Sequence, residues 1–499
     1  MSYPIAYTIF FVLCISAVMI HAILGVLSHK ELPHKNYIYI LLVLFAVGTS
    51  ALMPDITVVY SVLTGESSEY PNISVATDSN GDYNSDGVSD QVQINEALQH
   101  AKNNNIETVY LRSGIYTIDD SIQIPDGMTL TGDADATVKL VENWDVTRSD
   151  MFTPMITGTE VVSENFKKGS NITISGFTLD GNKDNQDAIS AMDEIDSFPA
   201  IQFYYSGHIT VKDMVIRNIP GDGIRLSNGE SYHQILNNRI HDTGHDDIFI
   251  MHGNHDVIDA NTLSHVAHDS GIRLDDSANV QVTNNTIWTN NDGLSGIYLL
   301  KHDTGQDSHN ITIAYNAIYN TREMGILLAM YADDMPVTSA RDVYIHNNII
   351  NGAGVDSREG HPYGGGIWLD GWNNTLIQDN AIDGNMGDGI AYSQRLPGHN
   401  YTAAYTTFVR DNIIINTIDS PLQSDDGYGI NNRLGENYSF VLENNIVWNN
   451  ENGNYNNVGS HDTDINVNPL FADPFSYISY KKDLWWRYLG GTGSNQMDN

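Results

Sequence analysis

The sequence predicts an all-β protein whose main body is a right-handed parallel β-helix of roughly ten turns. An N-terminal capping helix and, before it, two transmembrane helices complete the expected architecture. Three observations lead to this prediction. The composition is rich in Asn, Asp and Gly and low in charge, an Asn recurs at a regular spacing, and short apolar-alternating runs accompany each recurrence.

Composition and charge limit the possible partners. The chain has 499 residues, and 24 Lys plus Arg against 62 Asp plus Glu give a net charge of −38. Hydrophobic residues make up 41%, which argues against a disordered chain. The acidity argues against nucleic acid, because a phosphate-binding surface needs clustered Lys and Arg. A single cysteine, Cys14, excludes a disulfide framework and a Cys-based zinc site.

Residues 1–60 are expected to anchor the chain in the cell membrane. Ile5–Leu27 is an apolar run of 23 residues, long enough to span about 30 Å of hydrocarbon as a helix. Tyr37–Met53 is a second apolar run, 17 residues long. Lys30 and Lys35 lie between the runs and place that loop in the cytoplasm by the positive-inside rule. The main domain is then extracellular, whether the first run spans the membrane or, alternatively, is a cleaved signal peptide.

Residues 61–105 are expected to form a linker and a cap. Asp90–Asn103 has the pattern of an amphipathic helix with Asp90 as its N-cap. Such a helix would cover the open end of the coil and protect its edge. The apolar residues expected on its buried face are Val92, Ala97, Leu98 and Ala101.

The same segment offers a possible metal site. The spacing of its polar residues is similar to the start of an EF-hand loop, with Gln93 where the twelfth ligand is normally Glu. A Ca²⁺ site and a plain turn followed by a helix cap both fit this pattern. The candidate ligands are Asp82, Asn84, Asp86 and Asp90.

Residues 106–475 carry the repeat. An Asn two residues before Ile, Leu or Val recurs with gaps of 23, 24, 31, 32, 32, 32 and 33 residues. A second column is centred on Ile and begins with gaps of 24, 24 and 25 residues. The Asn column is Asn238, Asn261, Asn285, Asn316, Asn348, Asn380, Asn412 and Asn445. The Ile column is Ile224, Ile248, Ile272, Ile297, Ile326, Ile367, Ile390 and Ile430.

A period near 24 residues with about three short strands describes one turn of a parallel β-helix, and turns stack about 4.8 Å apart. We expect the Asn side chains to turn inward and bond to one another from turn to turn. The Gly before most of the Ile residues would permit a tight or left-handed corner. Residues 468–475 (NPLFADPF) are expected to close the far end, and residues 476–499 form a C-terminal tail.

Two stretches carry a resemblance to known proteins. They read ATDSNGDYNSDGVSDQVQINEAL and VYLRSGIYTIDDSIQIPDGMTLTGDADATVKL. They resemble the N-terminal part of pectin-lyase-like β-helices and, more narrowly, the disaggregatase and disaggregatase-related proteins of methanogenic archaea. The resemblance implies an enzyme that cuts the chondroitin-like heteropolysaccharide around cell aggregates. The membrane spans depart from a simple secreted enzyme and indicate a tethered form.

Placing successive turns in register predicts where chemistry gathers. With Ile224, Ile248 and Ile272 aligned, equal offsets from these residues become neighbours in space. Acids, imidazoles and guanidinium groups then meet in three adjacent turns. The residues brought together are Asp222, Arg225, His245, Asp246, Asp247, His268, Asp269 and Arg273.

This cluster suits glycoside hydrolysis, which needs two carboxyl groups about 5 to 9.5 Å apart. Crowded like charges raise one carboxyl pKa and create a proton donor. The candidate catalytic residues are Asp246, Asp247, Asp269 and His268. The candidate substrate-binding residues are Arg225, Arg273 and His245, with Tyr298, Lys301 and Trp368 further along the same face. Arg225 and Arg273 could hold a uronate or sulfate.

Other interpretations stay open at this point. Asp and Gly could be corner residues that repeat because the turn repeats, and the aromatic residues could be ordinary outward-facing side chains. A polysaccharide lyase would use Tyr298, Lys301 or His302 as base, often with Ca²⁺. A non-catalytic surface protein could bind polysaccharide on the same face. Hydrolysis requires no cofactor, and the oligomeric state is left open.

Overall fold

The computed structural model describes the greater part of the chain after residue 71. Both expected membrane spans and residues 469–499 lie outside the described residues. Among the residues that are described, no helix is long and apolar enough to cross a membrane. The described ranges are 72–144, 153–163, 166–186, 198–227, 229, 231–289, 293–302, 305–330, 339–354, 364–393, 404–421, 426–435, 438–459 and 461–468.

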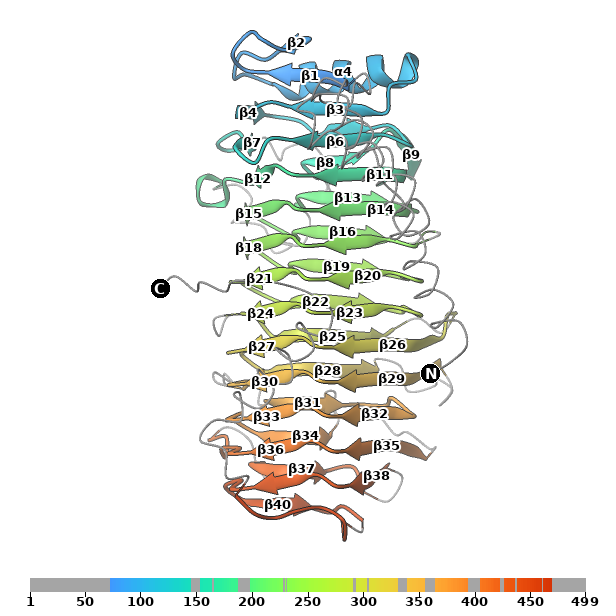
Figure 1. The fold of residues 1–499 in the computed structure, drawn as a ribbon, viewed down its shortest axis with the longest axis vertical. Helices are drawn as coiled ribbons and strands as arrows, with labels where there is room; N and C mark the ends of the chain where they lie inside the picture. The colour runs from blue at the N-terminus through green and yellow to red at the C-terminus, as the bar shows by residue number, and fades with distance from the viewer. Residues whose placement is uncertain are drawn as a thin grey trace, which may run out of the picture. The chain divides into compact units, whose positions relative to one another are not determined.

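The unit Asn72–Asn499 is built on three parallel sheets that wind into a right-handed β-helix (Figure 1). Each turn contributes one strand to each sheet, and the next turn adds its strands in register. We call the sheets A, B and C.

Sheet A has 14 strands. In spatial order these are β2 (Tyr83–Asn84), β1 (Asn72–Ala76), β3 (Thr108–Leu111), β6 (Thr129–Gly132), β11 (Ser170–Ser175), β14 (Gly207–Lys212), β17 (Gln234–Leu236), β20 (Val257–Asp259), β23 (Gln281–Thr283), β26 (Ser308–Ala314), β29 (Ala340–His346), β32 (Thr375–Gln378), β35 (Tyr405–Arg410) and β38 (Tyr438–Glu443).

Sheet B has 12 strands. They are β4 (Gly114–Ile118), β7 (Ala136–Leu140), β12 (Thr178–Asp180), β15 (Val215–Ile219), β18 (Arg239–Thr243), β21 (Thr262–Ser264), β24 (Thr286–Trp288), β27 (Ala317–Tyr319), β30 (Ile349–Asn351), β33 (Ala381–Asp383), β36 (Ile413–Ile415) and β39 (Ile446–Trp448).

Sheet C also has 12 strands. They are β5 (Ile122–Ile124), β8 (Ile156–Gly158), β13 (Ile201–Tyr204), β16 (Ile224–Ser227), β19 (Ile248–Met251), β22 (Ser270–Asp275), β25 (Ser295–Lys301), β28 (Met324–Met330), β31 (Gly365–Leu369), β34 (Asp388–Tyr392), β37 (Tyr428–Asn432) and β40 (Gly453–Asn456).

The coil is longer than the ten turns expected from the repeat. The early turns lack the Asn and Ile markers, so the sequence pattern did not count them. Sheet A also starts before the capping helix, since β1 pairs with β3 and lies within the segment expected to be a linker. One antiparallel hairpin, β9 (Glu160–Ser163) and β10 (Phe166–Lys168), forms a separate two-stranded sheet.

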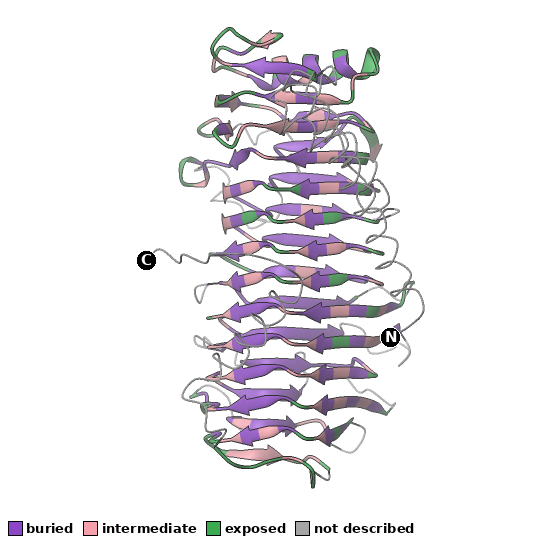
Figure 2. Cartoon of the chain, viewed as in Figure 1, coloured by how far each residue is buried: buried purple, intermediate pink, exposed green. Residues whose placement is uncertain are grey.

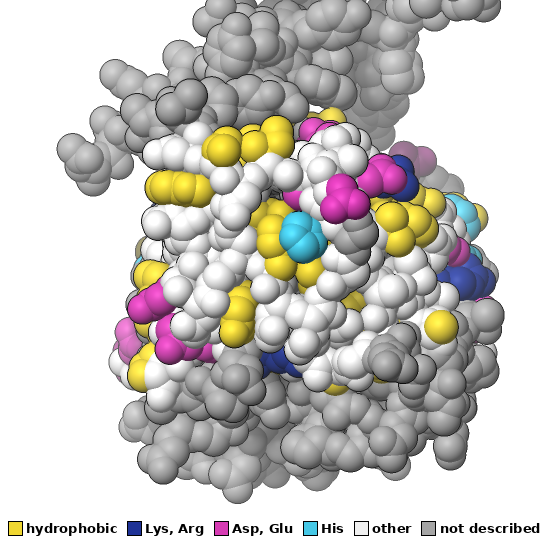
Figure 3. All heavy atoms as spheres, turned by 90° about the horizontal axis from the view of Figure 1, so that it is seen from below, with side chains coloured by type: hydrophobic (Ala, Val, Ile, Leu, Met, Phe, Trp, Pro, Cys, Tyr) yellow, Lys and Arg dark blue, Asp and Glu magenta, His cyan; other side chains and the backbone are white. Residues whose placement is uncertain are grey.

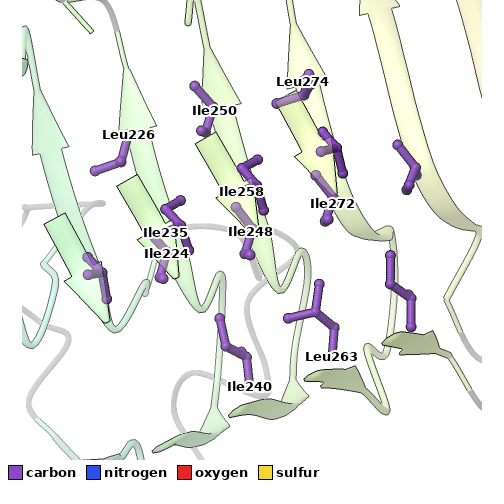
Figure 4. Close-up of a cluster of buried hydrophobic side chains, with 14 of the residues drawn as sticks. Ile224, Leu226, Ile235, Ile240, Ile248, Ile250, Ile258, Leu263, Ile272 and Leu274 are labelled. Carbon is purple, nitrogen blue, oxygen red and sulfur yellow. The ribbon is translucent and has the colours of Figure 1, made fainter. Parts of the chain in front are cut away.

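The core is a set of aliphatic stacks inside the coil. Ile224, Ile248 and Ile272 lie one above another in sheet C, as the register predicted (Figure 4). All three are fully buried, and burial runs along the whole coil (Figure 2). Each strand alternates between inward and outward side chains, so every turn adds apolar area to one continuous core.

The predicted Asn ladder is confirmed. Asn261 Oδ1 accepts hydrogen bonds from the backbone N–H and Nδ2 of Asn238, at 2.9 Å each. The same pair of bonds repeats along all eight residues of the Asn column to Asn445, whose N–H and Nδ2 donate to Asp464 Oδ1. The residue before each ladder Asn has a left-handed φ, for example Ala260 at 58° and Tyr315 at 60°. At all eight positions this corner is therefore formed without glycine.

The glycines that precede the Ile column, which we call the Gly column, are required for a different reason from the expected one. Gly223, Gly271, Gly296 and Gly325 do not have a left-handed φ. A Cβ on Gly271 would instead lie 2.5 Å from Ile287 Cγ2 and 2.9 Å from the carbonyl oxygen of Gly296. Glycine is required here because the next strand and the next turn approach too closely for a side chain.

The capping helix is α4 (Gln91–Asn103), the single α-helix of the described residues. Ala97, Leu98 and Ala101 are buried as expected, and Ile94 joins them. The prediction that Val92 is buried is wrong, because this residue is 46% exposed. Asp90 occupies the N-cap position, yet its carboxylate bonds to other backbone groups and not to the helix.

Candidate active site

The three turns that were aligned from the sequence stack in that register. β16, β19 and β22 pair Ile224 with Ile248 and Ile248 with Ile272. The acids that precede these Ile residues therefore meet at the N-terminal ends of these three strands of sheet C. The outward residue after each Ile forms a second column of Arg225, Phe249, Arg273 and, in β25, Tyr298.

One imidazole lies among three carboxyl groups. His245 Nδ1 is 2.8 Å from Asp222 Oδ1 and 3.2 Å from Asp246 Oδ2, and its Nε2 is 3.8 Å from Asp269 Oδ2. Burial lowers the pKa of His245, but Asp246 and Asp222 outweigh it and raise the pKa to about 11. The ring is therefore a cation at neutral pH and holds the carboxyl groups together.

Asp246 is the buried centre of this group. Its Oδ1 accepts the backbone N–H of Ser270 at 2.8 Å. Its Oδ2 is buried and makes no hydrogen bond of good geometry, although His245 Nδ1 and, at 4.0 Å, Arg273 Nη1 lie near it. Burial and then the charge of Asp269 raise the pKa of Asp246 to about 7, against the opposing effect of His245 and Arg273. A carboxyl group with this pKa can carry a proton at neutral pH.

The two arginines are bound by carboxylates of the protein itself. Arg225 Nη1 donates to Asp222 Oδ2 at 3.0 Å. Arg273 donates to both oxygens of Asp275, at 3.0 and 2.8 Å, and its Nη1 reaches Asp269 Oδ2 at 3.1 Å. Arg273 was expected to hold a substrate anion by two parallel hydrogen bonds. In the structure Asp275 already accepts those two bonds.

Phe249 completes this arrangement and was missed in the sequence. The guanidinium carbons of Arg225 and Arg273 lie 4.8 and 4.7 Å from its ring centroid, one from each neighbouring turn. Such cation–π contacts hold the guanidinium groups in place. The signal was available, because Phe249 follows Ile248 as the two arginines follow their own Ile. Asp275 could also have been found, since it shares a strand face with Arg273.

Asp269 and His268 form the outer part of the site. Asp269 Oδ1 accepts from Ser270 Oγ at 3.0 Å, and the side chain of Asp269 is 11% exposed. His268 is exposed, and its ring stacks on His245 with centroids 5.6 Å apart and planes at 19°. Both side chains can meet a ligand at the surface, whereas Asp246 lies beneath them.

Asp247 lies apart from its neighbour Asp246. Asp247 stands where most other turns have the glycine before Ile. At the equivalent position one turn earlier, a Cβ on Gly223 would point to the core residue Ile240. Asp247 Oδ1 accepts from Thr243 Oγ1 at 2.8 Å, and its Oδ2 is buried without a hydrogen bond. Burial raises the pKa of Asp247 well above its usual range. The geometry does not give its carboxyl group access to a substrate.

Three of the expected binding residues are buried. Lys301 is fully buried, and its Nζ lies 2.6 Å from Asp276 Oδ1. Tyr298 is 2% exposed and packs near Arg273, with the guanidinium carbon 5.6 Å from its ring centroid. Trp368 is 1% exposed, and its Nε1 donates to the carbonyl of Ser393. These three side chains are therefore part of the protein interior and do not line a binding surface.

The expected Ca²⁺ loop does not assemble. Asp82 Oδ2 accepts from the N–H and Oγ of Ser74, both at 2.8 Å, and Asn84 Oδ1 accepts the N–H of Gly81. These oxygens are used by turn and strand donors, so they do not converge.

The remaining two candidates are engaged in the same way. Asp90 Oδ1 accepts the N–H groups of Asp86 and Gly87, its Oδ2 accepts that of Thr117, and Asp86 Oδ1 accepts that of Val88. The plain turn is therefore the better description of this segment.

The acid centre is where the described residues could hold a metal ion. One ligand atom each from Asp222, His245 and Asp246 lies within 4.8 Å of the others. In the structure the Nδ1 hydrogen bond to Asp222 already joins these atoms.

The comparisons with known proteins agree with the fold. Residues 165–339 match the family described as right handed beta helix region. The A-module of the Azotobacter vinelandii mannuronan C-5 epimerase AlgE6 superimposes with a TM-score of 0.53 at 18% identity, covering 77% of this chain and 97% of that one. The catalytic domain of a GH87 alpha-1,3-glucanase gives 0.54 at 16% identity, covering 77% and 67%. No curated protein sequence matches the chain.

Fold and comparisons together define a right-handed parallel β-helix protein. Within that class, residues 308–491 match the family described as disaggregatase related. The resemblance expected from the sequence is confirmed, although this match covers the C-terminal turns and not the N-terminal stretches that first indicated it.

Proposed function

We propose that the protein is a polysaccharide-degrading enzyme, an endo-acting glycoside hydrolase for an acidic, chondroitin-like heteropolysaccharide outside the cell. The observation that carries this proposal is the pair Asp246 and Asp269, held on opposite nitrogens of one cationic imidazole. Two carboxyl groups in unlike environments are the machinery of glycoside hydrolysis. The disaggregatase-related match supports this proposal, and the structural neighbours, a mannuronan epimerase and an alpha-1,3-glucanase, support a polysaccharide as the substrate.

In this proposal Asp246 supplies the proton to the leaving oxygen of the glycosidic bond through one bridging water, because its carboxyl group is buried beneath Asp269 and His268. Asp269, which is paired with Arg273 and 11% exposed at its side chain, acts as the base or nucleophile. His245 is a positioning residue, because its two ring nitrogens lie 2.8 Å from Asp222 Oδ1 and 3.8 Å from Asp269 Oδ2. Ordinary general acid–base catalysis by such a pair accelerates reactions by about 10²–10⁴-fold.

Charge balance supports an acidic substrate. The cations Arg225, His245 and Arg273 gather at this centre, whereas the chain as a whole has a net charge of −38. A uronate or sulfate approaching this point meets less repulsion than elsewhere on the surface. Tethering by the two N-terminal spans would keep the enzyme at the cell surface.

Elimination is the second candidate, because the exposed imidazole of His268 stands beside the cationic ring of His245. A base next to a neutralised uronate is what a polysaccharide lyase requires. A third possibility is a protein that binds polysaccharide on this face without cutting it.

Product analysis separates these candidates. The full chain is incubated with chondroitin-type and uronate-free polysaccharides, and products are examined by mass spectrometry and ultraviolet absorbance. Hydrolysis gives oligosaccharides that have gained water and have no unsaturated uronate. Unsaturated ends would identify a lyase, and binding without products would contradict an enzyme.

A further inference from the structure

A second pair of carboxyl groups meets near the C-terminal end of the coil, away from the acid centre. Asp419 and Asp426 lie on the segment that joins β36 to β37. Their side chains lie within hydrogen-bonding distance of each other, which two ionised carboxylates avoid unless a proton or a cation lies between them. Seen from this end of the coil, acidic side chains gather in groups at the surface (Figure 3).

The backbone around this pair holds the two acids in place. The N–H of Ser420 donates to Asp426 Oδ1 at 3.0 Å. Asn452, from the following turn, donates through Nδ2 to Asp419 Oδ1 at 2.8 Å and to the carbonyl of Asp426 at 2.7 Å. Gly427 has a φ of 79°, and a Cβ there would lie 3.1 Å from both Cα and N of Asp419. Glycine is required at this position because the two ends of the segment approach so closely.

One oxygen of the pair is buried without a partner. Asp426 is 0% exposed, and its Oδ2 accepts no hydrogen bond. Its Oδ1 is bound by Ser420, which leaves Oδ2 for the contact with Asp419. A buried carboxylate oxygen that has lost its water and gained no hydrogen bond is costly. A cation between the two carboxyl groups would supply the missing interaction.

The surroundings of the pair add negative charge. Glu451 lies beside it, because Glu451 Oε2 accepts the N–H of Asp419 at 2.9 Å. Asp388, at the start of β34, acts on Asp426 as a further negative charge. Arg433 opposes that effect, but its Nε and Nη2 donate to Asp388 Oδ2 at 2.9 and 2.6 Å. The acids at this place therefore outnumber the cation that faces them.

A cation fits these surroundings better than a shared proton. A proton neutralises one charge, whereas Asp419, Asp426 and Glu451 bring three carboxyl groups together. Asp419 and Glu451 are exposed, so a hydrated ion can reach the pair from solvent. Carboxylate oxygens are the ligands of hard divalent cations, which complete their coordination shell with water.

We propose that Asp419 and Asp426 bind a hard divalent cation, Ca²⁺ or Mg²⁺, that joins the segment between β36 and β37 to the last turns of the coil. Asp426 Oδ2 and the exposed carboxylate of Asp419 are the direct protein ligands, and Glu451 lies next to them. Two direct ligands are fewer than the three groups that converge at the acid centre. The dissociation constant should therefore be high, about 10⁻⁴–10⁻³ M as in extracellular calcium modules. This site is independent of the proposed catalytic activity.

The number of bound ions tests this site in the full chain, stripped of metal with EDTA and dialysed against CaCl₂ or MgCl₂. At about 10 mM salt, tenfold above the highest dissociation constant expected, wild type should bind one ion per chain more than Asp419→Asn or Asp426→Asn. Both substitutions keep the size of the side chain. Asp411→Asn is the matched control, because it removes an exposed carboxylate from the same turn at a left-handed φ that Asn also adopts. It should bind as many ions as wild type.

Hydrogen exchange then shows where the ion binds. The amides of residues 416–420 all donate hydrogen bonds, the last of them to Asp426 itself. The same salt concentration should slow their exchange about tenfold or more in wild type and leave it unchanged in Asp426→Asn. Asp419→Asn repeats the test with an exposed side chain, whose substitution does not disturb the core.

A response to Ca²⁺ alone, to Mg²⁺ alone or to both would support the site and identify its ion. Three results would overturn it: equal numbers of ions on wild type and Asp426→Asn, loss of the ion in Asp411→Asn as well, or exchange at residues 416–420 that neither ion slows. The last result would leave a shared proton as the link between the two acids.

Discussion

His245 Nδ1 donates a hydrogen bond to Asp222 Oδ1 at 2.8 Å, across one full turn of the coil. The two residues are 23 positions apart in the sequence and meet only because the turns stack in register. This contact ties the acid centre to the fold, because any slip between β16 and β19 would separate the imidazole from its carboxylates. The centre is therefore a property of the stacking and not of a local motif.

The first prediction concerns the charge of His245. Burial opposes the charge, yet Asp246 and Asp222 raise the folded-state pKa to about 11 from 6.5. A raised pKa means that the stabilisation is fully present below pH 6.5 and is lost as pH rises toward 11. The difference in melting temperature between wild type and His245→Gln should therefore shrink between pH 7 and pH 10. A difference that grows with pH would contradict a cationic His245.

The second prediction separates the two adjacent aspartates. Burial raises the pKa of Asp247 well above its value in the unfolded chain, so folding disfavours the ionised form and Asp247 destabilises the fold progressively as pH rises. Asp247→Asn keeps an acceptor for Thr243 and removes this penalty. We expect a higher melting temperature at pH 8, by about 1 °C for each kcal/mol of penalty removed in a unit of this size, a smaller gain at pH 5, and cleavage activity within twofold of wild type. Loss of activity would return Asp247 to the catalytic group.

The third prediction concerns the Asn ladder. Asn316→Ala leaves the N–H and Nδ2 of Asn285 and the carbonyl of Val282 without their buried partner. Such groups cost about 1–3 kcal/mol when unsatisfied, which urea unfolding measures. Gln281→Ala, on an exposed outward position of β23, is the control and should change stability by less than about 0.5 kcal/mol. Equal effects of both substitutions would show that the ladder adds no stability of its own.

Much of the fold could be predicted because the coil repeats its own markers. The period placed Asn261 over Asn285 and Ile248 over Ile272, and the structure confirms both. The additional turns were not predicted, because they carry neither the Asn nor the Ile of the repeat. The role of the Gly column also escaped, since a close approach between Gly271 and Ile287 depends on packing between sheets that periodicity does not describe.

The sequence predicted which residues of the candidate site meet, but it did not predict the directions and partners of all their side chains. Register brought Asp222, His245 and Asp246 together correctly. It could not tell which side chains point out, so Lys301 was expected at the surface and is instead buried against Asp276. It also could not show that Arg273 is already held by Asp275, because the choice between an internal and an external anion depends on side-chain direction.

The measurement that tests the catalytic proposal most directly is the release of reducing ends from a chondroitin-type polysaccharide by three proteins: wild type, Asp246→Asn and Asp388→Asn. Asp388 is a matched control, since it is buried and paired with Arg433 at the start of β34 on the same sheet, five turns from Asp246. We predict that Asp246→Asn lowers the rate at least 100-fold while its folded circular dichroism spectrum is retained, and that Asp388→Asn stays active. Undiminished release by Asp246→Asn would contradict the proposal.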